Sequence, residues 1–176
     1  MSIFGFIVLT LIILFGATFI YVTSKINSLE IASRDRGAEI DSTIWDRTFR
    51  LSKMIEILRE KGIENDIDVP DTNAFGLGTS AFIQSTRAEQ LDTAERKLRR
   101  IIKEHPELMN DEAFNINLNK FDTARKELFS YSLAYNKCTS AYNSYISVFP
   151  ASALATLNKK SDRQMFSYVF ADIKED

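Results

Sequence analysis

The fold of this chain is set by residues 111–150, whose sequence is DEAFNINLNKFDTARKELFSYSLAYNKCTSAYNSYISVFP. An aromatic or leucine residue recurs at every seventh position: Phe114, Phe121, Leu128, Tyr135, Tyr142 and Phe149. Leu118 and Ile146 fall between them at the complementary heptad position. This spacing predicts one long helix with a continuous apolar seam, which Asn110 or Asp111 caps and Pro150 ends. A seam of that length needs partner helices, so the sequence predicts an all-α protein.

Composition limits the class of protein. The chain has 176 residues, a formal net charge of −2 and 26% charged residues, which fits one domain and indicates no nucleic-acid partner. Cys138 is the sole cysteine, so no disulfide forms within the chain. With His105 as the sole histidine, we expect Cys138 to be a packing residue rather than a reactive thiol.

Residues 3–22 carry no charge and are mostly apolar, which is the length that a helix needs to cross a bilayer. No positive region precedes this run and no clear cleavage site follows it, which favours a retained anchor over a signal peptide. We therefore expect an anchor over residues 1–24 and a helical domain over residues 25–176. Lys25, Arg34 and Arg36 follow the span, which predicts a single-pass protein with its domain in the cytoplasm.

The helical pattern continues past the anchor without a proline, with Gly37 as its one weak point. One face is apolar, and Trp45 and Phe49 are expected to widen it; its members are Ile26, Leu29, Ile40, Ile44, Leu51, Met54, Ile55 and Leu58. The opposite face is expected to be solvated, with Arg36, Asp46, Arg47, Arg50, Lys53 and Arg59. The membrane helix is thus predicted to run directly into the first helix of an elongated antiparallel bundle of three to four helices.

Residues 62–79 contain glycine, proline and four acids, and they predict a loop at the membrane-distal tip of the bundle. Phe75 and Leu77 either fold back on the bundle or bind a protein partner. The acids resemble a calcium loop only loosely, because the glycine and the closing glutamate of an EF-hand are missing at the required positions. We expect no metal and no cofactor.

Thr79 or Ser80 can cap the next helix, which is expected to run antiparallel to the first and to end near His105-Pro106. Its last turns carry Arg96, Arg100 and Lys103 on one side. These cations either complement the helix dipole and solubilise the bundle, or attract anionic lipid. The antiparallel arrangement leaves them about 20 Å from the bilayer at 1.5 Å per residue.

Asn136 and Asn143 follow the seam tyrosines Tyr135 and Tyr142 at the same relative position. Partly buried asparagines can fix helix register by side-chain hydrogen bonds, and a ligand-binding role is the alternative. The final stretch, residues 158–176, contains an amphipathic segment with Met165, Phe166, Val169, Phe170 and Ile173. It either packs on the bundle or forms a self-association surface.

The segment Glu104-His105-Pro106-Glu107-Leu108, the two Tyr-Asn pairs and the pair Phe149-Pro150 together resemble the signature of the LemA family. The likeness covers residues 94–166 best, and residues 62–79 depart from the helix that the family usually has there. The resemblance implies a divergent member of bacterial origin, built as an antiparallel helical bundle on a membrane anchor. It implies no catalytic residues.

The sequence therefore predicts a membrane-anchored scaffold that binds other proteins or itself, with homo-oligomers as one form and no enzymatic activity. The alternative is a lipid-organising or membrane-remodelling oligomer that acts through Arg96, Arg100 and Lys103.

Overall fold

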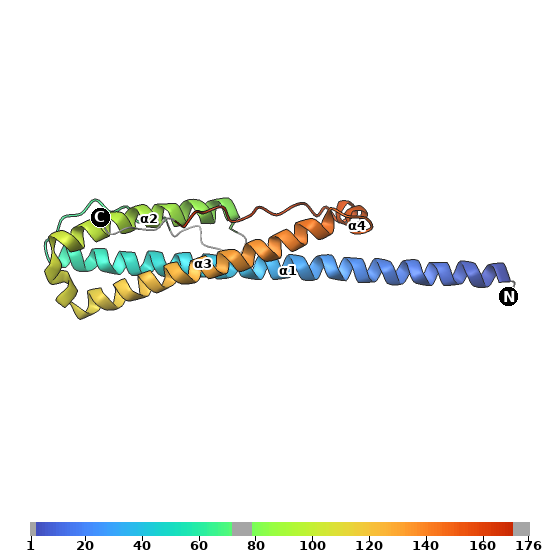
Figure 1. Cartoon of the computed structure of the whole chain (residues 1–176), viewed down its shortest axis with the longest axis horizontal. Helices are drawn as coiled ribbons and strands as arrows, with labels where there is room; N and C mark the ends of the chain where they lie inside the picture. Colours follow the sequence, from blue (N-terminus) through green and yellow to red (C-terminus); the bar gives the residue numbers. More distant parts are fainter. Residues whose placement is uncertain (1–2, 72–78, 171–176) are drawn as a thin grey trace. The chain divides into compact units, whose positions relative to one another are not determined.

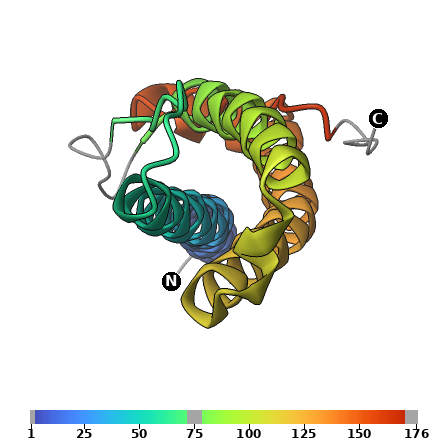
Figure 2. The ribbon, with the colours of Figure 1, turned by 90° about the vertical axis from the view of Figure 1, so that its left-hand side faces the viewer.

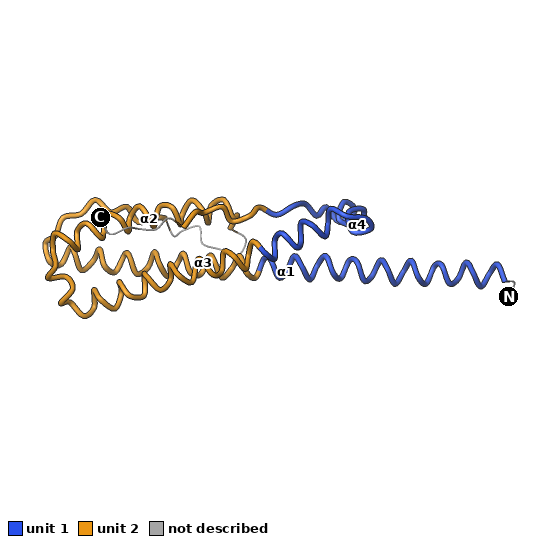
Figure 3. The backbone as a smooth tube through the Cα atoms, viewed as in Figure 1, with its two compact units in different colours: residues 1–34, 137–163 blue, residues 35–136, 164–176 orange. Residues whose placement is uncertain are grey.

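The structure is a computed structural model, which describes residues 3–71 and 79–170 (Figure 1). Its described part is all-helical and contains no strand. The elements are α1 (Ile3–Glu60), α2 (Ala81–Glu104), the 3-10 helix η1 (Pro106–Asn110), α3 (Glu112–Ile146) and α4 (Ala151–Leu157). The chain divides into two compact units, residues 1–34 with 137–163 and residues 35–136 with 164–176 (Figure 3).

α1 is one uninterrupted helix of 58 residues, as the absence of proline in this stretch predicts. Among the described helices, α1 alone is long and apolar enough to cross a membrane. The most apolar part of α1 lies near its N-terminus, and none of it is buried by protein. Large apolar side chains are exposed along this part, among them Ile3, Phe4, Leu11, Ile12, Ile13, Phe15 and Ile20. The helix ends at Glu60 and is followed by Gly62, whose φ of 72° is accessible to glycine without a steric penalty.

The starts of α2 and α3 follow the predicted caps. The Ser80 hydroxyl accepts a hydrogen bond from the Ile83 N–H at 3.3 Å, and the Asp111 carboxylate accepts one from the Phe114 N–H at 3.0 Å. Both bonds satisfy an amide that the first turn of a helix leaves without a partner. α2 ends at Glu104, directly before His105-Pro106, as expected.

The core of the second unit is shared by three helices, α1, α2 and α3, which lie around it in Figure 2. α1 contributes Ile40, Ile44, Leu51, Met54 and Leu58; α2 contributes Ala88, Leu91, Ala94, Leu98 and Ile101; α3 contributes Phe114, Leu118, Phe121, Leu128 and Tyr135. The seam of residues 111–150 is therefore buried over its first four heptad positions within this unit. Burial of each such aliphatic or aromatic side chain contributes about 1.5–3 kcal/mol.

α2 runs parallel to α1, so the antiparallel arrangement predicted for these two helices is wrong. The Gln84 side-chain amide donates to the Gly37 carbonyl at 2.9 Å, and further along both helices Arg47 pairs with Glu95 at 2.5 Å. α3 is the helix that runs in the opposite direction: Asp122, near its start, meets Arg99 at 2.5 Å, and Arg125 lies 3.6 Å from Asp92.

The length of the connection between α1 and α2 explains this direction. Twenty residues, 61–80, separate the two helices, and an extended chain of that length reaches about 65 Å, whereas the 24 residues of α2 rise only about 36 Å. The described part of the connection lies along α2 (Figure 1): Asp66 pairs with Lys97, and Pro70 lies near Thr86, closer to the start of that helix. Residues 62–71 are therefore a crossover and not the tip loop that was predicted.

The first unit has a smaller core, formed by Val22, Ile26, Tyr142, Ile146, Ala151 and Ala155. α4 lies between the end of α3 and the C-terminal segment. The hydroxyls of Ser33 and Thr139 share a buried hydrogen bond of 2.7 Å, and Lys160 pairs with Glu30. These contacts join α1, α3 and the residues after α4 within this unit.

Three details differ from the sequence-based expectations. Trp45 and Phe49 do not widen the buried face: they are exposed and stack on each other, with ring centroids 5.5 Å apart. α3 ends at Ile146, before Pro150, because a proline disfavours the helical conformation of the residue that precedes it. The seam position Phe149 is consequently 81% exposed.

Candidate functional site

The two Tyr-Asn pairs of α3 hold the C-terminal segment, residues 158–170, which begins with a turn at residues 158–159 and contains no helix or strand after it. In the second unit, the Asn136 side chain accepts a hydrogen bond from the Phe166 N–H at 2.8 Å and donates one to the Phe166 carbonyl at 2.9 Å. One amide group thus satisfies both main-chain groups of one residue, as a neighbouring strand would. We call this pair of bonds the Asn136 clamp.

An equivalent clamp lies in the first unit. Asn143 accepts from the Arg163 N–H at 2.9 Å and donates to the Arg163 carbonyl at 2.9 Å. Its neighbour Tyr142 is buried in the core of that unit, where burial first and the charge of Glu30 second raise the pKa of its phenol. Tyr142 is therefore a packing residue and Asn143 is the residue that binds the segment.

The spacing of the two asparagines matches the spacing of the segment residues that they bind. Seven residues of an α-helix rise by about 10.5 Å, and three residues of extended chain cover about 10 Å. Asn136 and Asn143 are seven apart on α3, and Phe166 and Arg163 are three apart on the segment. The register that these asparagines set is therefore that of an extended segment on α3, and not that of one helix on another.

Two more side chains bind the main chain of the segment in the second unit. The Tyr135 hydroxyl donates to the Gln164 carbonyl at 2.7 Å, and the Ser85 hydroxyl of α2 accepts from the Ser167 N–H at 3.0 Å. Each hydrogen bond of this kind contributes about 0.5–1.5 kcal/mol, and a buried partner left without its bond costs about 1–3 kcal/mol. These hydrogen bonds go to main-chain groups of the segment and do not depend on which side chains the segment carries.

Side chains of the segment alternate between buried and exposed positions, which fixes which of them face the helices. Phe166 and Tyr168 are buried and Phe170 is partly buried, whereas Ser167 and Val169 between them are exposed. The rings of Tyr168 and Phe170 meet edge to face at 4.5 Å, and Phe170 meets Phe129 of α3 in the same way at 5.0 Å. A period of two is the pattern of an extended strand with one face on the protein. The expectation that this segment packs on the helices is thus confirmed for its described residues.

Beneath Tyr168 lies a network of buried charges. Arg47 of α1 is fully buried and its Nη2 lies 2.9 Å from Asp92 and 2.5 Å from Glu95, both on α2. The guanidinium also lies over the Phe121 ring, 4.6 Å from its centroid. Nε and Nη1 of Arg47 have no hydrogen-bond partner among the described residues, so the ring face supplies part of the compensation that they lack.

The network is balanced in charge, with three cations and three acids: Arg47, Arg99, Arg125, Asp92, Glu95 and Asp122. Burial acts to lower the pKa of Arg99, but its contacts with Asp122 and Glu95 outweigh burial and raise it. Tyr168 closes the network by donating its phenol proton to Asp92. Burial first and this hydrogen bond second raise the pKa of Tyr168 well above its ordinary value of 10.0.

The solvated position predicted for Arg47 is therefore wrong. The helical pattern places it opposite the most apolar positions, but two helices and the C-terminal segment together enclose that side of α1 within the second unit. One signal in the sequence pointed this way: Asp92 and Glu95 stand three apart among the apolar positions of α2, which leaves two acids in need of a buried cation.

The basic residues Arg96, Arg100 and Lys103 are all exposed, near the C-terminal end of α2. Because α2 is parallel to α1, this end lies beside the C-terminal end of α1: Lys97 pairs there with Asp66, just after α1. The return of these cations toward the anchor, which was predicted from an antiparallel arrangement, is therefore wrong.

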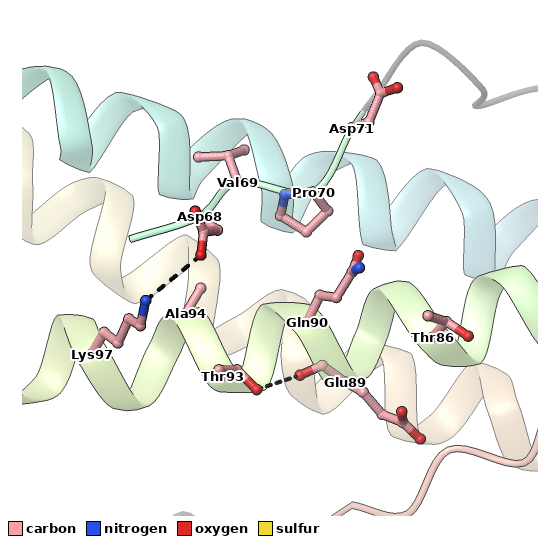
Figure 4. Close-up of a pocket in the computed structure, with 10 residues that line it drawn as sticks. All are labelled: Asp68, Val69, Pro70, Asp71, Thr86, Glu89, Gln90, Thr93, Ala94 and Lys97. Carbon is pink, nitrogen blue, oxygen red and sulfur yellow. Dashed lines mark hydrogen bonds and ion pairs between the residues drawn. The ribbon is translucent and has the colours of Figure 1, made fainter. Parts of the chain in front are cut away.

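An open groove of about 590 Å³ lies between the crossover and α2 (Figure 4). Lys97 reaches across it to Asp66 at 3.1 Å and Asp68 at 3.7 Å, and its hydrogen bond to Asp66 lowers the pKa of that carboxyl. No group of three or more metal-binding side chains occurs among residues 3–71 and 79–170. The predicted partner-binding residues Phe75 and Leu77 lie outside the described residues.

No protein-family model matches the chain, and no curated protein and no solved structure is significantly similar to it. The resemblance to the LemA family therefore rests on the quoted sequence motifs alone.

Proposed function

We propose that this chain is a membrane-anchored helical scaffold that self-associates or binds other proteins, with residues 3–22 in the bilayer and no catalytic role. The remainder forms a helical bundle in which α3 runs antiparallel to α1 and α2. We further propose that the chain is a divergent LemA protein of a bacterial membrane, with its domain in the cytoplasm. The heptad seam and the two Tyr-Asn pairs support that assignment.

One observation carries the proposal: the apolar stretch of α1 and the core residues of α1 belong to one helix. Its first part exposes apolar side chains on all sides, which is stable in hydrocarbon and costly in water. Its last part buries Ile40, Ile44 and Leu51 against α2 and α3. The same helix thus carries both the apolar stretch and part of the packed core.

The alternative function, a lipid-organising oligomer acting through Arg96, Arg100 and Lys103, loses its main support. It depended on the return of these cations toward the anchor. Within the second unit they lie beside the C-terminal end of α1, because α2 runs parallel to α1.

The proposal is tested by extraction of the full chain from membranes. We expect the protein to stay in the membrane pellet after alkaline carbonate treatment, and a double variant Ile12→Arg/Ile13→Arg to be released, because each arginine at the centre of a span costs about 2.5–3.5 kcal/mol. Ser24→Arg/Asn27→Arg, after the span, is the matched control and should stay in the pellet. Release of the wild type would contradict the anchor.

Self-association is tested separately by amine-reactive crosslinking in intact membranes. Covalent dimers or larger assemblies of the wild-type chain are the expected result. A chain that remains monomeric and captures no other protein would contradict the scaffold role while leaving the anchor intact.

A further inference from the structure

We propose that the C-terminal segment, residues 158–170, exchanges between neighbouring copies of this chain. The segment binds a face of α2 and α3 that carries Ser85, Tyr135 and Asn136. In the exchanged assembly, this face of one copy is occupied by the segment of the next copy. The inference rests on the proposed function, since it names the contact through which the scaffold self-associates.

The first reason is that the face recognises main-chain groups. Asn136, Tyr135 and Ser85 bind the backbone of residues 164–167, and none of these hydrogen bonds depends on how the segment is joined to its own helices. A segment from a second copy offers the same N–H and C=O groups with the same spacing. Its contacts are therefore identical in the two arrangements, which is the condition for exchange.

The second reason is that the face cannot stay empty. When the segment leaves, the Asp92 carboxylate loses the phenol of Tyr168, and the buried network of Arg47 and Glu95 is opened on that side. The Asn136 amide and the apolar surface under Phe166 lose their partners at the same time. Because unpaired buried charges and amides are unfavourable, an emptied face binds the next matching segment that reaches it.

The third reason is the link between the segment and α4. α4 ends at Leu157, and the following residues include Lys159, whose φ of 52° lies in the left-handed region that a lysine rarely adopts. In this conformation the N–H groups of Lys159 and Lys160 bind the Thr156 and Ala155 carbonyls and cap the end of α4. A change of Lys159 to an ordinary φ opens this cap and redirects the chain. The five residues 158–162 reach about 17 Å when extended, which is the length over which the link can displace the segment.

Membrane anchoring makes a second copy available. Confinement of the chains to two dimensions raises the local concentration of segments, which favours exchange between copies.

Disulfide trapping in membranes tests the exchange. In a Cys138→Ala background, one tagged chain carries Ser85→Cys and a differently tagged chain carries Ser167→Cys, since these two residues touch at 3.0 Å. Both are co-expressed as full-length proteins and oxidised in the membrane. We expect a covalent dimer that contains both tags. Thr93→Cys, an exposed position further along α2, replaces Ser85→Cys in the control and should give no dimer with Ser167→Cys.

A second chain with both Ser85→Cys and Ser167→Cys distinguishes the outcomes. Closure of this chain into an intramolecular disulfide, with no mixed dimer from the separate variants, would overturn the exchange. If amine crosslinking still gives assemblies in that case, the proposed scaffold stands and only the contact is wrong. Absence of both disulfides would show that the segment does not occupy this face, and would equally overturn the inference.

Discussion

Replacement of both clamp asparagines is the sharpest test of the site on α3. In Asn136→Asp/Asn143→Asp, each side chain keeps the size of asparagine and one acceptor oxygen for the N–H of Phe166 or Arg163. The donor is lost, and a carboxylate oxygen instead faces the carbonyl that the amide had bound at 2.9 Å. The substitution therefore removes one hydrogen bond per clamp and leaves a carbonyl without a partner.

The magnitude follows from the two lost bonds. Each of these part-buried hydrogen bonds contributes about 0.5–1.5 kcal/mol, so the pair of substitutions weakens the binding of the segment by about 1–3 kcal/mol when the two sites act independently. Since 1.4 kcal/mol corresponds to a factor of ten, opening of the segment becomes at least about 5-fold more frequent. Neither asparagine belongs to the core of the second unit, but Phe166 and Tyr168 of the segment do, so opening of the segment also uncovers the part of that core under these rings.

Amide hydrogen exchange of the full chain in detergent, read by mass spectrometry, measures this opening. Peptides covering residues 159–170 should exchange faster in the double variant by the predicted factor, whereas peptides of α1 and α2 in the second unit should change less. Asn119→Asp, an exposed position on the same helix, is the matched control. If the segment is equally protected in the double variant and in the control, the asparagines do not hold it.

Three further predictions follow from the second unit. Arg47→Met should lower the free energy of unfolding by about 3 kcal/mol in urea denaturation, because it removes the buried cation that lies nearest to the Asp92 and Glu95 carboxylates and leaves these acids with the longer contacts to Arg99 and Arg125. A loss no larger than that of the exposed Arg59→Met would contradict the network. Gly37→Ala should raise the unfolding free energy by about 0.5–1 kcal/mol, since alanine favours the helix and the added Cβ meets the Tyr135 ring at an ordinary 3.4 Å. Gly37→Leu, with its larger side chain, should lower the unfolding free energy. A lower melting temperature for Gly37→Ala would show that there is no room for a Cβ beside the Tyr135 ring. Because the pKa of Tyr168 is raised in the folded state, its contribution to stability is complete below pH 10.0 and declines as the pH rises above that value, by up to about 1.4 kcal/mol per unit; Tyr168→Phe should lack this part of the alkaline slope, and equal slopes above pH 10 would refute the assignment.

The sequence predicted the helical elements well because their signals are local. Ser80 and Asp111 cap their helices through bonds to amides three residues away, and Pro106 stands two residues after the end of α2. Apolar periodicity likewise identified the main buried positions of α1 and α3, whereas Phe149 is exposed. The sequence also singled out Asn136 and Asn143, because two Tyr-Asn pairs seven residues apart are conspicuous in a helix.

The binding partner of those asparagines could not be predicted from the sequence. An asparagine beside a helical seam can bind another helix, a ligand or an extended segment, and nothing local distinguishes these. The C-terminal segment carries an apolar pattern that also suits a helix, yet it is extended, because its main-chain groups bind Asn136, Asn143, Tyr135 and Ser85.

What the sequence determined by itself is the set of helices, the apolar stretch of residues 3–22 and the heptad seam, all of which depend on residues within a few turns of one another. The tertiary structure alone decided the direction of α2, since a connection of twenty residues can lead either to a tip or back along the helix. It also decided that Arg47 is buried, since that depends on α2, α3 and the C-terminal segment meeting at one position of α1. Both decisions rest on contacts between residues that are far apart in the sequence.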